Sequence, residues 1–265
     1  MGTAGETEAA AAAFRRSVNE DIGGGGGLTE TMKLEDDFKG YDVDEFSIPE
    51  RYKQSLLSVL ITHGMVVDRT AALAKMANDY FGDQDVVVLG VLNGCFRFYS
   101  VFVDQLNKLR KDFRNSVFYE FVRLKSYVDA NSLGTVQNSL DMFVLFCFSS
   151  SLFSNVSALF QLQSGNLSFL TGKHVLVVED IIETGKTMEK LLSVLDSVKP
   201  LSVKVLTLLT KRTDAPAVFK PDFVGFDIPN HFVVGFGFDY NEMFRDMDHI
   251  CIINDYGKLK YSIKS

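Results

Sequence analysis

A chain of 265 residues with 46% hydrophobic content can bury one substantial core, so we expect a single globular domain. The formal net charge of −7 argues against binding of nucleic acid through a general basic surface, so an anionic ligand must be met by a local group of amides and cations. The three cysteines show neither paired nor metal-binding spacing, which favours a reducing compartment, and we expect a cytoplasmic protein.

The first 32 residues are predicted to form a disordered tail. They contain an alanine run at residues 9–13 and a glycine run at residues 23–27, a composition that cannot support a packed core. We expect no signal peptide, because charged residues such as Glu6, Glu8 and Arg15 interrupt every apolar stretch of this segment.

The globular part begins near Leu34 and alternates between predicted helices and strands. Residues 48–50 resemble a helix start, and Leu56, Leu57, Leu60 and Ile61 follow with helical spacing. Further helices are predicted over residues 66–81, after residues 93–95 to about residue 109, and over residues 186–198. Strands are predicted over residues 85–92, 118–124, 174–178, 203–209, 223–226, 233–234 and 249–254. This alternation predicts an α/β fold with a mostly parallel sheet.

The segment over residues 174–188 carries the most chemical information. A short apolar run ends at Glu179 and Asp180, and a Thr-Gly-Lys-Thr turn at residues 184–187 then opens a helix. Adjacent acids at the carboxyl end of a buried strand can hold ribose hydroxyls or a metal-bound water. Gly185 permits a tight turn, and the amides that follow can bind a phosphate at the helix N-terminus. Adjacent surface acids are common, but the whole combination indicates a phosphorylated sugar with a divalent metal.

This segment resembles the phosphoribosyl-pyrophosphate signature of type I phosphoribosyltransferases. More narrowly, it is similar to the hypoxanthine-guanine phosphoribosyltransferases and to their close paralogue, the phosphoribosyltransferase-domain-containing protein. The resemblance runs from about Leu34 to Lys260, with matching stretches at residues 63–64, 68–70, 123–127, 211–213, 220–226, 232–235, 239–242 and 244–246. It implies a type I phosphoribosyltransferase fold over residues 33–265, with a twisted, mostly parallel sheet, flanking helices and a small hood.

The resemblance implies a purine-salvage reaction in which hypoxanthine or guanine and phosphoribosyl pyrophosphate give IMP or GMP and pyrophosphate. The protein must then neutralise the departing pyrophosphate and align two reactants. Matching positions assign the ribose hydroxyls and Mg²⁺ to Glu179 and Asp180, and a second magnesium to Asp239 through water. They assign the 5′-phosphate to Thr184, Gly185, Lys186 and Thr187, and the pyrophosphate to Asn93, Gly94 and Arg245. Taken alone, Asp239 and Arg245 are more simply surface charges or a local ion pair.

Three further positions are implied to bind the purine. Lys211 would donate to the 6-oxygen, Phe232 would stack on the ring, and the Val233 carbonyl would accept from the N1 and amino edge. A lysine cannot accept from a 6-amino group, so this arrangement favours 6-oxopurines. An isolated lysine, or one of 23 phenylalanines, is by itself more simply structural.

Two positions depart from the family pattern. The catalytic acid–base residue at purine N7 is normally Asp and is Glu183 here, and a displacement of about 1 Å near a reacting atom can lower a rate by ~100-fold. The pyrophosphate loop expected as Leu-Lys-Gly-Gly reads Leu92-Asn93-Gly94-Cys95, so a cation is lost beside the diphosphate. We therefore expect weaker binding of phosphoribosyl pyrophosphate.

The resemblance is interrupted after Ser126 and Tyr127, which match the start of the mobile loop that closes over the family's active site. An apolar insertion follows at about residues 138–162, and no charged residue occurs from residue 142 to 172. Serines interrupt this stretch, and flanking strands of one sheet must stay on one side of a membrane, so we expect no membrane anchor. A partner-binding insert is one alternative, and a gene-model artefact or retained intron is the hypothesis that we favour.

Three functions remain open at this stage. The first is a Mg²⁺-dependent enzyme, the second a nucleotide-binding paralogue with little turnover, and the third a regulator that senses phosphoribosyl pyrophosphate. The carboxylate at Glu183 favours the enzyme, whereas Asn93 and the insertion favour the binding module. The resemblance also implies a homodimer or homotetramer, and the net charge of −7 leads us to expect no nucleic-acid partner.

Overall fold

The computed structural model describes residues 31–110, 117–130, 136–146, 161–164 and 167–263. Residues 1–30 of the predicted tail lie outside this set, as do residues 147–160 of the predicted insertion. The tail prediction extends one residue too far, because Met32 already pairs with Phe226 in strand β1 (Met32–Lys33).

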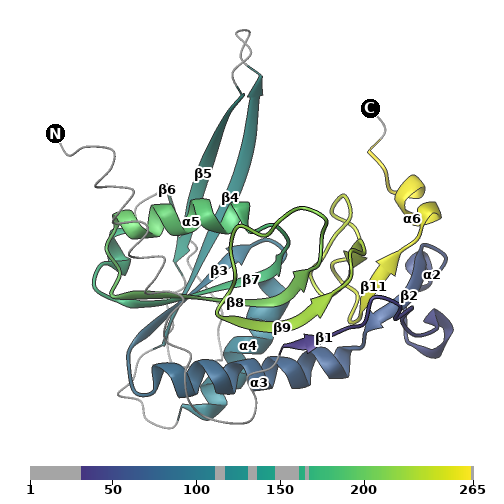
Figure 1. The fold of residues 1–265 in the computed structure, drawn as a ribbon, viewed down its shortest axis with the longest axis horizontal. Coiled ribbons are helices and arrows are strands. Elements are labelled where there is room, and N and C mark those ends of the chain that lie inside the picture. The colour runs from purple at the N-terminus through teal and green to yellow at the C-terminus, as the bar shows by residue number, and fades with distance from the viewer. Residues whose placement is uncertain (1–30, 111–116, 131–135, 147–160, 165–166, 264–265) are drawn as a thin grey trace.

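The main sheet has eight strands and is mostly parallel, as expected (Figure 1). From β1 it continues through parallel neighbours β9 (Phe223–Ile228), β8 (Ser202–Lys211), β7 (His174–Ile182), β3 (Val86–Leu92) and β4 (Val117–Ala130). Two antiparallel strands, β5 (Val136–Phe146) and β6 (Gln161–Ser164), complete it.

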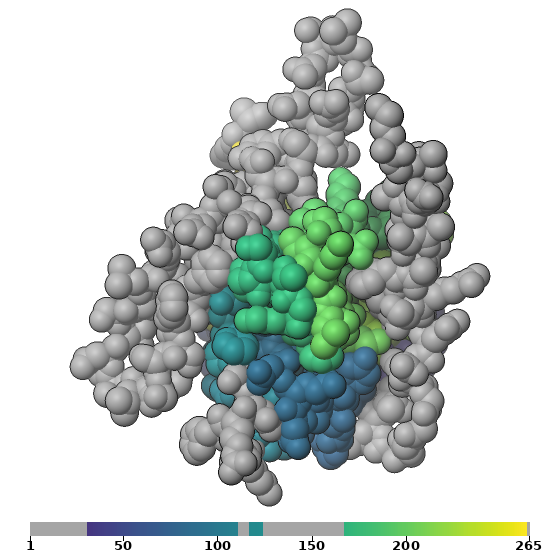
Figure 2. Space-filling view, turned by 90° about the vertical axis from the view of Figure 1, so that its left-hand side faces the viewer, coloured from purple at the N-terminus to yellow at the C-terminus, as the bar shows by residue number. Residues whose placement is uncertain are grey.

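Helices cover both faces of the sheet, so its central strands are apolar on both sides. Helices α3 (His63–Phe81) and α4 (Phe96–Leu109) lie on one face and α5 (Lys186–Ser197) on the other (Figure 1). In β3, Val86 and Val88 belong to the core under α3 and α4, while Val87 and Leu89 belong to the core under α5. Figure 2 shows this layering from the side, with the blue segment that includes α3 below the green segment that includes α5.

A smaller sheet forms the hood, in the order β10 (Val233–Val234), β11 (Ile250–Ile253) and β2 (Leu56–Ile61). Around it lie the short helices η1 (Val43–Glu45), α2 (Glu50–Lys53) and α6 (Asp255–Lys260), while η2 (Ser168–Leu170) precedes β7. A third core joins these parts through residues such as Tyr52, Val59 and Phe244.

The predicted helix at residues 56–61 is wrong, because this segment is strand β2. Helix α2 ends at Lys53, and β2 pairs with β11 so that Leu56 faces Ile253 and Ile61 faces Ile250. All of β2 except Leu57 is buried. A run that is apolar on every side carries no period that separates a buried strand from a buried helix, so pairing with β11 decides the outcome.

The other predicted elements are confirmed within a few residues, and two strands are longer than expected. Strand β7 continues through both acids of the signature to Ile182, because Glu179 pairs with Thr207 and Ile181 with Leu209 of β8. Strand β4 extends to Ala130 and forms with β5 a long hairpin that projects from the domain (Figure 1). Within the described ranges, no helix has both the length and the apolar character needed to span a membrane.

Candidate active site

A cavity of about 390 Å³ opens where the parallel strands of the main sheet end and the hood begins. Open α/β sheets bind ligands at this edge, where several strand ends place side chains side by side. The cavity brings together residues from every part of the predicted pyrophosphate and purine sites. Its lining consists of Leu92, Asn93, Gly94, Arg123, Asp180, Ile181, Glu183, Lys211, Phe232, Val233, Phe238, Asp239 and Arg245.

The acid pair lies near the carboxyl end of β7, where both residues are half-buried. Burial raises the pKa of the Glu179 carboxyl well above its usual range, and the adjacent Asp180 raises it further. Burial also raises the pKa of Asp180, although its carboxylate accepts a 2.8 Å hydrogen bond from the Ile181 amide. Two adjacent, half-buried carboxyl groups at a cavity wall can share a cation with an anionic ligand, and this fits a divalent metal.

The donor set also limits how a metal could bind. Among the residues that the structure describes, no three acidic, histidine or cysteine side chains converge as a complete metal site. Mg²⁺ is commonly held by one or two carboxylates together with substrate phosphates. Glu179 and Asp180 therefore fit Mg²⁺ that arrives with an anionic substrate.

Gly94 packs directly against the Asp180 carboxylate. A Cβ atom at position 94 would lie 1.7 Å from Asp180 Oδ2, so any other residue would displace the carboxylate. The neighbouring Cys95 is fully buried in the core under α3 and α4, and burial raises the pKa of its thiol. The second glycine of the expected family loop is thus replaced by a residue that packs into the core.

The predicted phosphate loop surrounds a separate hollow of about 240 Å³, lined by Glu179, Thr184, Gly185, Lys186 and Thr187 with their neighbours. Gly185 has a left-handed backbone (φ +80°), and a Cβ there would lie 2.7 Å from Phe219 Cβ. Helix α5 begins at the next residue, so the free amides of its first turn surround the hollow. This arrangement matches an anion site at a helix N-terminus.

At the purine end of the cavity, Lys211 and Glu183 form an ion pair. Lys211 Nζ lies 2.5 Å from Glu183 Oε1, with the lysine side chain 9% exposed and the glutamate 50% exposed. Lys211 Nζ is also 5.9 Å from the centroid of the Phe232 ring. Phe232 remains 45% exposed beside the buried Val233. A donor, an acceptor and an accessible aromatic face therefore meet where a flat heterocycle could bind.

Asp239 and Arg245 form a local ion pair and also line the cavity. Arg245 Nη2 lies 2.9 Å from Asp239 Oδ1, and Nη1 donates to the Gly237 carbonyl at 2.8 Å. The Asp239 carboxylate also accepts a 2.8 Å hydrogen bond from the Glu242 amide. Asp239 and Arg245 therefore do form the local ion pair that is their simpler interpretation. Their position on the cavity wall also allows both to contact a ligand.

Arg123 was assigned no role from the sequence, yet it lines the cavity. It pairs in register with Leu92, the residue before the pyrophosphate loop, and so brings a guanidinium to the wall formed with Asn93. Its place in the matching stretch 123–127 was the available signal. Ser126 and Tyr127 continue the same strand, where their backbones pair with Leu140 and Ser139.

Comparisons with known proteins agree with this geometry. The family described as "Phosphoribosyl transferase domain" matches residues 60–241. Hypoxanthine-guanine phosphoribosyltransferase from Rattus norvegicus is 40% identical over 236 residues, which cover 88% of this chain and 98% of the rat protein. The Homo sapiens enzyme of the same name is 41% identical over 230 residues, covering 86% of this chain and 95% of its own.

A solved structure points the same way. The crystal structure of hypoxanthine-guanine phosphoribosyltransferase from Schistosoma mansoni in complex with IMP has a TM-score of 0.66 and 33% identity, covering 88% of this chain and 100% of that one. The parallel sheet, the acid pair and the phosphate loop define the class of type I phosphoribosyltransferases. Within that class, the chain belongs to the hypoxanthine-guanine phosphoribosyltransferase family.

Proposed function

We propose that the chain transfers a phosphoribosyl group from phosphoribosyl pyrophosphate to hypoxanthine or guanine, releasing pyrophosphate and forming IMP or GMP. The observation that carries the proposal is a single cavity that joins Lys211, Glu183 and Phe232 to Asp180 and Arg245. A purine and a ribosyl pyrophosphate need to meet within such a space, because alignment of two reactants supplies much of the rate enhancement.

In this proposal the purine lies against Phe232, with Lys211 donating to its 6-oxygen and the Val233 carbonyl accepting from its opposite edge. Glu183 accepts the proton from N7 as the bond from purine nitrogen to ribose C1 forms. Lys211 Nζ lies 2.5 Å from Glu183 Oε1, so the ion pair holds the proposed base beside the group that would bind the purine 6-oxygen.

At the other end, Glu179 and Asp180 hold the ribose hydroxyls, and the loop from Thr184 to Thr187 holds the 5′-phosphate. Mg²⁺ at the acid pair, with a second ion near Asp239, would neutralise the pyrophosphate as it leaves. Arg245 donates to the same pyrophosphate, for which its forked guanidinium is well suited. Asn93 and Gly94 line the adjacent wall.

We extend the proposal to a cytoplasmic homodimer or homotetramer. This part of the proposal rests on the assembly that the family resemblance implies. Light scattering coupled to gel filtration measures the molar mass, and a monomer at micromolar concentration would contradict this part of the proposal.

Turnover of hypoxanthine and of guanine with phosphoribosyl pyrophosphate and Mg²⁺ tests the main proposal. The expected result is formation of IMP and GMP by the full chain. The second candidate is a nucleotide-binding paralogue with little turnover, which is favoured by the lack of a cation at Asn93. Tight GMP binding without product formation, in the full chain and in a chain lacking residues 138–162, would support that candidate instead.

A further inference from the structure

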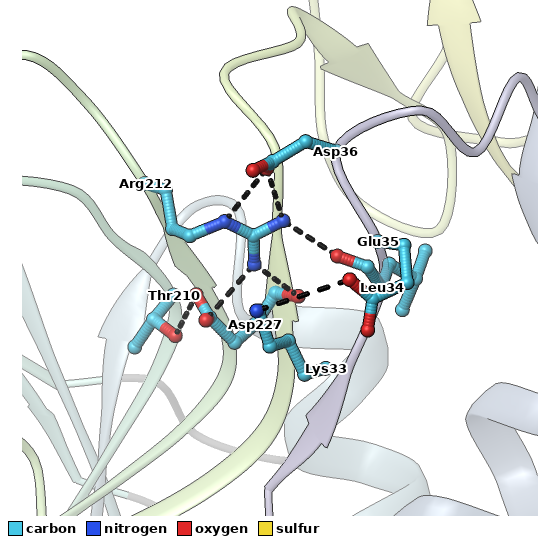
Figure 3. Close-up of polar contacts among 7 residues, drawn as sticks. All are labelled: Lys33, Leu34, Glu35, Asp36, Thr210, Arg212 and Asp227. Atoms are coloured by element: carbon cyan, nitrogen blue, oxygen red, sulfur yellow. Dashed lines mark hydrogen bonds and ion pairs between the residues drawn. The ribbon is translucent and has the colours of Figure 1, made fainter.

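Arg212 directly follows Lys211, and its guanidinium joins three segments of the protein (Figure 3). Nε and Nη2 donate to Asp36 Oδ1 at 3.1 and 2.8 Å, and Nη2 also donates to the Leu34 carbonyl at 2.5 Å. Nη1 donates to the carbonyl and to the carboxylate of Asp227, at 3.0 and 2.9 Å. All three guanidinium nitrogens are thus engaged, and two of the acceptors are backbone carbonyls.

These contacts hold the end of β8 on both sides of Lys211. The Arg212 amide donates to the Ile228 carbonyl at 2.9 Å, and Thr210 Oγ1 hydrogen-bonds to Asp227 Oδ1 at 3.2 Å. Thr210 and Arg212 therefore both bind Asp227 of β9. Side chains alternate along a strand, so the residue between them is directed to the opposite side, where Lys211 meets Glu183.

The same guanidinium attaches the start of the domain to this strand end. Lys33 of β1 pairs with Asp227, and the Leu34 amide donates to the Asp227 carbonyl at 2.9 Å. Arg212 holds the next residues, Leu34 and Asp36, from the β8 side (Figure 3). Hydrogen bonding to Arg212 lowers the pKa of the Asp36 carboxyl, so this acid stays ionised beside the guanidinium.

An ordinary surface ion pair is the competing explanation, because Asp36 is 80% exposed and exposed pairs stabilise proteins little. It does not account for the rest of the network. The Arg212 and Asp227 side chains are 27% and 26% exposed. Loss of the guanidinium would remove a donor from the Leu34 carbonyl and would leave the Asp227 carbonyl with the Leu34 amide. The network therefore restrains the backbone from which Lys211 extends.

We propose that Arg212 is a positioning residue for purine recognition: by tying Leu34, Asp36 and Asp227 to the end of β8, it fixes Lys211 where a 6-oxopurine binds. This inference rests on the proposed function and deepens it. Displacement of a recognition group by about 1 Å can lower efficiency ~100-fold, and partial release of a strand end should cost less, about tenfold in GMP affinity.

The test compares two ligands by calorimetry on the full chain, because GMP carries a purine and phosphoribosyl pyrophosphate does not. Arg212→Gln should weaken GMP about tenfold and leave the affinity for phosphoribosyl pyrophosphate with Mg²⁺ unchanged. Arg212→Lys should weaken GMP as well, because one ammonium cannot reach all the acceptors at Leu34, Asp36 and Asp227. Lys33→Gln is the matched control, since it removes the same charge beside the network and should bind both ligands like the wild type.

A double variant tests whether Arg212 affects GMP binding through Lys211. In a Lys211→Gln background, Arg212→Gln should produce little further loss of GMP affinity, since the group that it positions is already absent. Equal weakening of both ligands by Arg212→Gln, additive losses in the double variant, or wild-type GMP affinity in Arg212→Lys would each overturn the inference. A wild-type chain that binds GMP without turnover would contradict the proposed activity alone. A wild-type chain that binds neither ligand would overturn both.

Discussion

Glu183 is the residue at which this chain departs most directly from its family's chemistry. Its carboxylate lies 2.5 Å from Lys211 Nζ, so the group implied as general base contacts the group implied to bind the purine 6-oxygen. A side chain longer by one methylene moves the carboxylate relative to N7, and the ion pair holds it in that place. The proposed proton acceptor therefore lies away from the position that an aspartate carboxylate would occupy.

Shortening this side chain should raise the rate. Glu183→Asp restores the family's geometry, and we expect kcat for hypoxanthine to rise by up to about 100-fold, measured by the absorbance change on IMP formation. Glu45→Asp, an equally conservative change at an exposed position of η1, is the control. An unchanged or lower kcat in Glu183→Asp would show that this pocket is built around glutamate.

Asn93 permits a parallel test at the pyrophosphate end. Asn93→Lys adds a cation to the cavity wall and should lower the KM for phosphoribosyl pyrophosphate by about tenfold, since a charge-assisted hydrogen bond contributes roughly 1.5–3 kcal/mol. Gln84→Lys adds the same charge before the other end of β3 and should leave KM unchanged. Equal KM values for Asn93→Lys and the wild type would indicate that Arg123 already supplies the cation that this wall needs.

At the scale of elements, one ion pair connects α4 with the hood. Arg97 donates to Asp248 Oδ1 and to the Met247 carbonyl, both at 2.6 Å, and its guanidinium lies 5.2 Å from the centre of the Phe236 ring. Hydrogen bonding to Arg97 lowers the pKa of the Asp248 carboxyl. The pair thus holds the hood against the helix that begins at the pyrophosphate loop.

The pH dependence of this contact follows from the direction of the shift. Because the folded-state pKa of Asp248 is lowered, its stabilisation is present above the unfolded value of about 3.9 and is lost as pH falls through the folded value. Asp248→Asn should therefore lower the free energy of unfolding by up to about 1 kcal/mol at pH 7, and the difference should shrink below about pH 4. Urea titrations at both pH values measure it. A difference that is independent of pH would show that the charge of Asp248 is not the cause.

At the scale of the whole molecule, the hairpin of β4 and β5 contains part of the predicted insertion. Its strands pair from Glu120 with Phe146 to Ala130 with Val136, so part of the predicted insertion, residues 138–146, lies in a regular strand. The hypothesis that residues 138–162 come from a gene-model artefact or a retained intron stays a prediction. Their removal would leave a loop of ordinary family length over the cavity.

This prediction has two measurements. Transcript reads that cross the segment without a gap would exclude a retained intron. A chain lacking residues 138–162 should make IMP at least as fast as the full chain and aggregate less, because an apolar stretch without charged gatekeepers promotes association. Loss of folding in the shortened chain, seen by circular dichroism, would show that the hairpin belongs to the domain.

Much of the site could be predicted because its parts are local in the sequence. The buried run of β7, the acids within it and the turn at Gly185 lie within a few residues of each other, and each has a direct backbone or charge requirement. Strands β3 and β8 were also predicted correctly from local sequence, because each is an apolar run that is too short for a helix.

Other features depended on partners far away along the chain. Strand β2 is a strand only because β11, some 190 residues later, pairs with it, and its own apolar pattern suits a helix as well. The contact between Glu183 and Lys211 and the bridge from Arg212 to Asp36 are of the same kind. No local pattern encodes which charged side chains meet across the end of a sheet.

The amino-acid sequence by itself determined the α/β class, the family resemblance and the turn at Gly185 that precedes α5, because these arise from residue type and short-range spacing. Only the tertiary structure decided that Lys211 is paired with the proposed general base, that Arg123 lines the cavity beside Asn93, and that Arg212 joins Asp36 to Asp227. The physical reason is that side-chain pairing depends on distances across strands, and those distances exist only once β1, β8, β9 and the hood have packed together.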